Sequence, residues 1–199
     1  MSKIKHTKNE LKTQRDALRR FNRYLPTLLL KKQQLQMEMR QLEQRMEEVA
    51  GEEARLVAGL AAWVRLFAEP VDVGGLVKLA GVKTTSGNIA GVTIPVLQEI
   101  QFAPVPIDLY ATPAWVEEGA QAVEQLLQLR IEREILAEQH RLLADELRTT
   151  SQRVNLFEKV KIPECEENIR IIRIFLGDAQ TADVARSKLA KSKAPELAA

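Results

Sequence analysis

The chain has 199 residues, of which 28% are charged and only 5% are aromatic, a balance that favours long helices over a compact globular core. Its 29 Lys and Arg residues against 27 Asp and Glu are too evenly matched to indicate a nucleic-acid-binding protein. The single cysteine, Cys165, excludes an internal disulfide, and no apolar run is long enough to span a bilayer. We therefore expect a cytoplasmic protein that is neither secreted nor membrane-spanning.

The first third of the chain predicts one long coiled-coil helix over residues 1–69. Apolar residues occupy fifteen of nineteen positions spaced alternately three and four residues apart, and charged residues and glutamines lie between them. The four polar exceptions are Thr7, Gln14, Lys32 and Glu53. Pro26 interrupts the helix without ending the repeat.

Residues 70–113 have a different texture, because glycines and prolines punctuate short β-branched runs. The pattern predicts a small middle module with a β-hairpin whose strands lie at 82–85 and 89–96. The turn is expected at 86–88, where Gly87 or Asn88 can adopt a positive φ. Pro95 would keep its strand at the edge of a sheet.

A second long helix is predicted over residues 114–178. Thr112 can cap its start and Pro113 suits its first turn. Its apolar stripe crosses Pro163, where it is displaced by one position. Gly177 is expected to cap the end of this helix, followed by a basic, flexible tail over 179–199.

The two helices are of nearly equal length, which predicts that they pair with each other in an antiparallel coiled coil. If the residue numbers of facing positions add to about 181, Pro163 lies level with Leu18 and Pro26 with Asn155. We hypothesise that both helices bend in this zone, so that the prolines set a curved or under-wound segment. The pairing would also bring both basic ends of the chain together at one tip.

Candidate sites for chemistry are weak. The stretch GLVKLAGVKT (75–84) lacks the glycine and lysine spacing of a phosphate-binding loop. His6 and His140 lie at different heights of the predicted hairpin of helices, and Cys165 has no second cysteine to join it, so no zinc site can be assembled. Adjacent glutamates point about 100° apart on a helix, which indicates solvated faces. We predict no catalytic residues, no metal and no cofactor.

Three stretches of the chain stand out together: NIAGVTIPV (88–96), RVNLFEKVKIP (153–163), and the pair TKNEL (7–11) with LLLKKQQL (28–35). In this order and spacing they resemble the D subunit of the V-type and A-type rotary ATPases. The resemblance covers most of the chain. It implies a central rotor shaft that transmits torque between ATP turnover in the head ring and ion translocation in the membrane sector. The related F-type gamma subunit carries a larger insert than residues 70–113 could hold.

The resemblance also implies partners: the nucleotide-binding and non-catalytic head subunits around the tip, and the F subunit and the membrane-side rotor connector at the lower stalk. Nucleic acid and direct membrane insertion are not expected. Candidate head-binding residues are Lys3, Lys5, Lys8, Lys12, Arg15 and Arg173. Candidate lower-stalk residues are Trp63, Val92, Ile94, Pro95 and Trp115. Two alternatives stay open: a coiled-coil adaptor or tether, and a nucleic-acid-binding protein that uses the basic tip.

Overall fold

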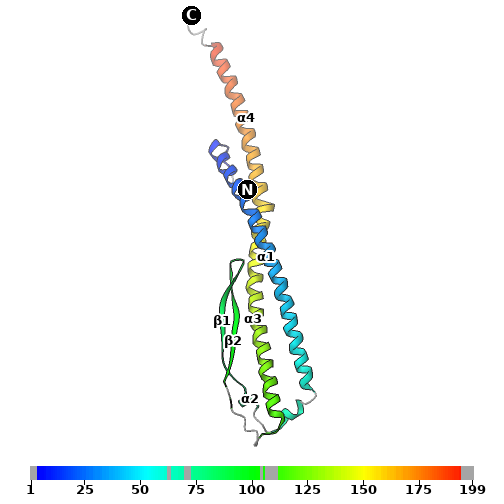
Figure 1. Ribbon diagram of the computed structural model, residues 1–199. Coiled ribbons are helices and arrows are strands. Elements are labelled where there is room, and N and C mark those ends of the chain that lie inside the picture. Colours follow the sequence, from blue (N-terminus) through cyan, green and yellow to red (C-terminus); the bar gives the residue numbers. More distant parts are fainter. Residues whose placement is uncertain (1–3, 62–63, 70–72, 104, 106–111, 194–199) are drawn as a thin grey trace. The chain divides into compact units, whose positions relative to one another are not determined.

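The computed structural model describes residues 4–61, 64–69, 73–103, 105 and 112–193. Its elements are α1 (Lys8–Ala61), η1 (Val64–Ala68), α2 (Val73–Leu76), β1 (Lys78–Ile89), β2 (Val92–Ala103), α3 (Trp115–Leu156), η2 (Phe157–Lys161) and α4 (Ile162–Lys193), as Figure 1 shows. The chain divides into two compact units, and α1 contributes to both. We call residues 1–31 with 150–199 the terminal unit, and residues 32–149 the middle unit.

Helix α1 begins at a side-chain cap that its sequence encodes. The Thr7 hydroxyl oxygen accepts a hydrogen bond from the Glu10 backbone N–H at 3.2 Å, which satisfies one of the free donors of the first turn. Pro26 lies inside the helix, which continues unbroken to Ala61. The expectation that Pro26 does not end the repeat is therefore confirmed.

In the terminal unit, α1 runs antiparallel to the second long helix. The rings of His6 and Phe175 lie 4.8 Å apart, and those of Phe21 and Phe157 lie 5.0 Å apart. The residue numbers of these pairs add to 181 and 178, which confirms the predicted register to within a turn. The buried side chains on α4 facing this seam are Cys165, Asn168, Ile169 and Ile172.

The second long helix has an under-wound turn near Pro163, as hypothesised, but it does not end where predicted. A π-helical turn, η2, separates α3 from α4 immediately before Pro163. In addition, α4 continues through Gly177 to Lys193, so the expected helix end at Gly177 is wrong. Ala179, Ala182 and Ala185 after the glycine are strong helix formers, and a Cβ at Gly177 would meet no atom within 4 Å.

The β-hairpin of the middle unit is longer than predicted and turns at a different place. Strands β1 and β2 each have 12 residues, and Ile89 pairs with Val92 across a two-residue turn. Ala90 and Gly91 form that turn with φ of 50° and 82°, as a type I′ turn requires. The Asn88 side-chain oxygen accepts a hydrogen bond from the Gly91 N–H. The expected turn at 86–88 is therefore wrong.

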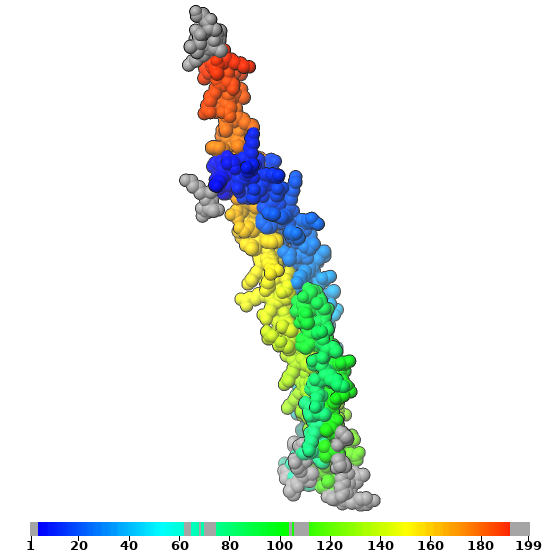
Figure 2. Space-filling model, turned by 90° about the vertical axis from the view of Figure 1, so that its left-hand side faces the viewer, coloured from blue at the N-terminus to red at the C-terminus, as the bar shows by residue number. Residues whose placement is uncertain are grey.

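The tip of the hairpin packs on both helices of the middle unit. Ile94 forms a buried cluster with Leu35 of α1 and Leu143 of α3. The Gln139 side-chain amide donates a hydrogen bond to the Pro95 carbonyl oxygen. Strands β1 and β2 lie along the helices of this unit, as Figure 2 shows from the hairpin side. A two-stranded hairpin is only marginally stable alone, so this docking is what holds it folded.

Polar contacts and ring contacts set the register of α1 against α3 in the middle unit. Glu43 lies 3.4 Å from His140, and the Phe67 and Trp115 rings lie 5.3 Å apart. The residue numbers of these pairs add to 183 and 182, again close to the expected 181. A mainly α fold, with antiparallel helices from both ends of the chain and a hairpin between them, is confirmed. Among the described helices, none combines the length and the apolar character needed to cross a membrane.

Candidate interaction surfaces

The head-binding candidates that the structure describes are all exposed on the terminal unit. Lys8, Lys12 and Arg15 recur every three or four residues and therefore share one face of α1. Lys5 lies just before the helix begins, and Arg173 lies on α4. Lys3 lies outside the described residues, so the structure gives it no position. A role for these residues in binding the head stays a prediction.

Arg173 and Arg15 come together from the two helices of the terminal unit. With Arg19, Leu18, Glu166 and Ile169 they line a cavity of about 590 Å³. Three guanidinium groups against one carboxylate give the rim of this cavity a net positive charge. A surface of this kind favours a protein partner with exposed carboxylates, because guanidinium groups bind them through paired hydrogen bonds. The sequence predicted this convergence only as a basic tip.

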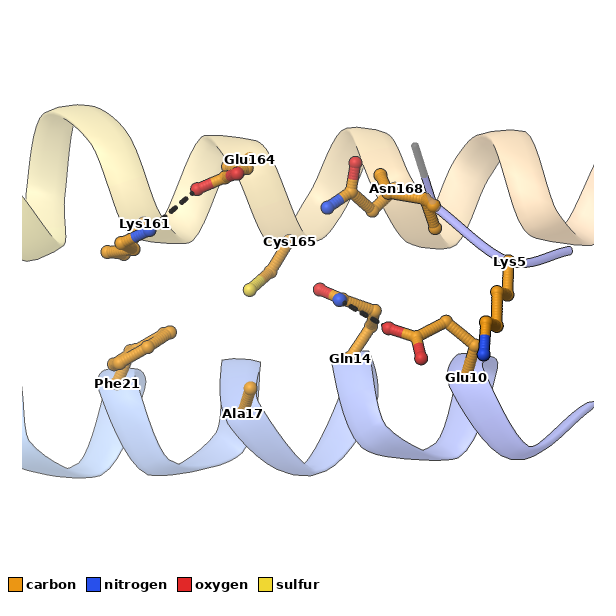
Figure 3. Close-up of a pocket in the computed structure, with 10 residues that line it drawn as sticks. Lys5, Glu10, Gln14, Ala17, Phe21, Lys161, Glu164, Cys165 and Asn168 are labelled. Atoms are coloured by element: carbon orange, nitrogen blue, oxygen red, sulfur yellow. Dashed lines mark hydrogen bonds and ion pairs between the residues drawn. The ribbon is translucent and has the colours of Figure 1, made fainter. Parts of the chain in front are cut away.

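A second cavity, of about 470 Å³, lies across the same seam (Figure 3). The Cys165 side chain points from α4 toward α1, where small Ala17 leaves the space. The Gln14 amide donates a hydrogen bond to the Glu10 carboxylate at 2.8 Å along α1. Lys161 pairs with Glu164 at 3.0 Å on the facing side. The polar seam residue Gln14 therefore borders a gap in packing.

The chemistry of this cavity is that of a packing gap. Burial raises the pKa of the Cys165 thiol, and the neighbouring Glu164 carboxylate raises it further. The thiol is therefore protonated near neutral pH, and a protonated thiol is a poor nucleophile and a poor metal ligand. No group of three or more His, Cys, Asp and Glu side chains in the described residues is arranged to hold a metal ion.

Trp115, a lower-stalk candidate, is held by contacts within the middle unit. Its indole N–H donates a hydrogen bond to the Glu69 carboxylate at 3.0 Å, and its ring meets Phe67 edge to face. A Cβ placed on Gly119 would come within 3.2 Å of the indole ring, so the ring lies against its own helix, α3, at this glycine. Trp63, its expected neighbour, lies outside the described residues.

The three hairpin candidates sit at different depths. Ile94 is buried in the cluster with Leu35 and Leu143, whereas Val92 and Pro95 are half-buried beside it. Their contact with a partner stays a prediction. The apolar side chains that the hairpin does expose are Leu79, Val82 and Val96. Of these three, Leu79 lies outside the predicted strands, whereas Val82 and Val96 lie within them, and their exposure depends on which face of the hairpin packs on the helices.

A set of ion pairs between α1 and α3 of the middle unit was also missed. The Glu53 carboxylate, with a side chain only 12% exposed, accepts hydrogen bonds from Arg130 at 3.1 Å and Arg133 at 2.7 Å. Arg45 of α1 reaches Glu132 of α3 at 2.8 Å, and this hydrogen bond raises the pKa of the arginine. The available signal was Glu53 itself, a carboxylate at a seam position that needs a charged partner.

The chain is similar along almost its whole length to rotary ATPase proteins. The family model described as the D subunit of ATP synthase matches residues 10–192. A protein of Borreliella burgdorferi, named as the D subunit of a V-type ATP synthase, is 47% identical over 96% of this chain and 95% of its own length. Proteins of the same name from Chlamydia abortus and Chlamydia pneumoniae are 36% and 33% identical, each over 96% of this chain and over 94% and 92% of their own lengths. With its paired helices and central hairpin matched almost end to end, this chain belongs to the family of ATP synthase D subunits.

Proposed function

We propose that this chain is the central rotor shaft of a V-type rotary ATPase. In this role it is a non-catalytic subunit that transmits torque between ATP turnover in the head ring and ion translocation in the membrane sector. It works on the cytoplasmic side and reaches the membrane through the assembled complex. Membership of the D-subunit family and the paired long helices support this proposal.

The observation that carries the proposal is the number of large apolar side chains that the terminal unit exposes. They are Tyr24, Leu29, Leu30, Leu156, Val160, Ile171, Ile174, Phe175, Val184 and Leu189. Scattered exposed apolar residues are normal, but ten on so slender a unit leave much apolar surface in water. We infer that other protein subunits cover this unit in the working complex.

The charges of the terminal unit support the head subunits as these partners. Arg15, Arg19 and Arg173 surround one cavity, and Lys8 and Lys12 extend the basic surface along α1. A basic, apolar helix pair fits inside a ring of head subunits that present carboxylates and apolar loops. Each head subunit then meets a different face of the shaft. As the shaft rotates, these unequal contacts would bias each head subunit in turn between its open and closed states.

The middle unit is suited to hold a fixed geometry under load. Glu53 ties α1 to Arg130 and Arg133 of α3, and the hairpin packs on both helices through Ile94. The exposed hairpin residues Leu79, Val82 and Val96, together with Val92, Pro95 and Trp115, provide the surface for lower-stalk partners. In our proposal those partners are the F subunit and the membrane-side rotor connector.

Removing the basic cluster tests this function directly. Arg15, Arg19 and Arg173 are replaced together with alanine in a reconstituted complex, and ATP hydrolysis and ion transport are measured in the same preparation. We expect ATP hydrolysis to continue while ion transport per ATP falls. The matched control replaces Arg40, Arg55 and Arg148, three exposed arginines of the middle unit. It removes the same charge and should leave coupling intact.

Two results of this experiment would contradict the proposal. Full coupling in the triple variant of the terminal unit would show that the basic cluster does not engage the head. Equal loss of coupling in both triple variants would show that net charge, and not this surface, matters. If the unchanged chain folds but joins no ATPase complex, the coiled-coil tether is favoured instead.

A further inference from the structure

The apolar stripe of the second long helix contains one irregular step. Within the terminal unit the stripe passes through Thr150, Val154, Phe157, Ile162, Cys165, Ile169 and Ile172. Every step between these residues is three or four positions except the five positions from Phe157 to Ile162. In an α-helix five residues turn the chain about 140° beyond a full turn. A continuous α-helix would therefore point Ile162 and everything after it away from the seam with α1.

The π-helical turn η2 lies at this irregular step. The Ile162 N–H donates its hydrogen bond to the Phe157 carbonyl oxygen, five residues earlier, in place of the α-helical acceptor four residues earlier. The wider turn absorbs one extra residue and returns Ile162 to the side of the helix that Phe157 occupies. The result is visible in burial, because Val154 before the turn and Cys165 after it are both buried.

Pro163 follows this turn directly. In an unbroken α-helix residue 163 would donate to the Lys159 carbonyl, and a proline there both lacks the N–H and crowds that oxygen. Next to η2, however, the α-helical pattern is already interrupted, because the Ile162 N–H reaches back five residues instead of four, so Pro163 does not break a continuous α-helical hydrogen-bond ladder. The π turn thus places Pro163 directly after a local interruption of the α-helical hydrogen bonds, where its missing N–H costs less than in an unbroken α-helix.

We propose that Pro163 and η2 together form a phase-setting element that fixes which face of α4 packs on α1. The proline disfavours the α-helical alternative, and the π turn places the five-residue step where the stripe requires it. Without this element α4 would be turned by about 100° for the one extra residue. Cys165 and Ile169 would leave the seam, and Arg173 would leave the cavity that it shares with Arg15. The importance of the Arg173 position rests on the proposed function, in which Arg173 faces the head subunits.

The test combines a deletion with a substitution in the full chain. Deleting Val160, an exposed residue of η2, shortens the irregular step from five residues to four. The stripe then requires a plain α-helix, which Pro163 opposes. We expect this variant to lose roughly 10 °C in melting temperature. Adding Pro163→Ala to the deletion should restore most of that loss, whereas Pro163→Ala alone should have a small effect.

Thiol labelling reads the phase of α4 independently of stability. Cys165 is 5% exposed in the seam and is the sole cysteine of the chain. If the Val160 deletion keeps the π turn, α4 rotates and Cys165 should react roughly tenfold faster with a thiol reagent. In the chain that carries both changes, Cys165 should be as protected as in the unchanged protein.

A second deletion supplies the control. Ile171 is also an exposed β-branched residue, but no proline follows it closely. Its deletion should lower the melting temperature, and Pro163→Ala should not restore it. The proposal is wrong if the Val160 deletion leaves both the melting temperature and the protection of Cys165 unchanged. It is also wrong if Pro163→Ala restores the melting temperature of both deletion variants, or of neither. All readouts use the isolated chain, so they decide this point whether or not the rotor-shaft function holds.

Discussion

Replacing Ile94 with alanine is expected to release the β-hairpin from the helices of the middle unit. Ile94 is 4% exposed and lies between Leu35, which is fully buried, and Leu143, which is 1% exposed. The substitution removes three carbon atoms, worth about 2.4 kcal/mol at roughly 0.8 kcal/mol per buried methylene. The cavity left against two rigid helices adds to this loss. We therefore expect the free energy of unfolding to fall by about 2 to 5 kcal/mol.

Urea denaturation and hydrogen exchange measure the two parts of this effect. Denaturation gives the change in global stability, and exchange of the β1 and β2 amides reports whether the hairpin opens while the helices stay paired. The control is Val96→Ala in the same strand, because Val96 is 38% exposed. It should cost less than about 1 kcal/mol. Equal effects of the two substitutions, or hairpin exchange unchanged by Ile94→Ala, would refute the docking argument.

Three further predictions follow from the seams and the turn. Ala17→Cys should form an intrachain disulfide with Cys165 under mild oxidation, seen as a mobility shift without reducing agent, because the two residues line one cavity. Glu53→Gln should lower the free energy of unfolding by about 1 to 2 kcal/mol, whereas Glu132→Gln, which breaks a more exposed pair, should cost less than about 1 kcal/mol in the same urea titration. Ala90→Val should destabilise the hairpin by more than about 1 kcal/mol, measured by amide exchange, because a β-branched residue fits poorly at a φ of 50°.

The helices and their pairing were predictable because they depend on a repeat that many residues share. No single substitution hides a stripe that runs through Leu35, Leu42 and Val49, and near-equal helix lengths leave one simple way to pair them. The π turn was foreseeable only in outline. The displaced stripe and Pro163 predicted an under-wound segment, but the i to i+5 hydrogen bond is a property of the folded backbone.

The errors arose where a local signal opposed a tertiary one. Ser86, Gly87 and Asn88 have the chemistry of a turn, yet the hairpin turns at Ala90 and Gly91. Ala90 packs against the cluster around Leu35, and this contact offsets the cost of a positive φ that an isolated alanine would avoid. Gly177 likewise has the chemistry of a helix cap, but the alanine-rich sequence beyond it continues the helix.

The candidate surfaces were harder to predict than the fold, because they depend on which side chains remain free once the helices pair. The basic residues of α1 were evident from the sequence, but their convergence with Arg173 required the register and the phase of α4. The same holds for Trp115. Its position near the helix junction was predictable, whereas its hydrogen bond to Glu69 depends on the path of residues 64–69.

The seam between the paired helices is filled differently in the two units. In the middle unit, ion pairs such as Glu53 with Arg133 and the docked hairpin bridge α1 and α3, and the cavity that Leu42 and Leu143 help to line there is only about 200 Å³. In the terminal unit, small Ala17 leaves a cavity in the seam, and the ion pairs shown on α4, such as Arg170 with Glu167, lie within one helix. A helix pair with a larger gap in its seam and more apolar side chains facing water gains more from an enclosing partner than a better-filled pair does. The unit that most needs support is therefore the one whose charge and apolar surface are suited to a surrounding ring.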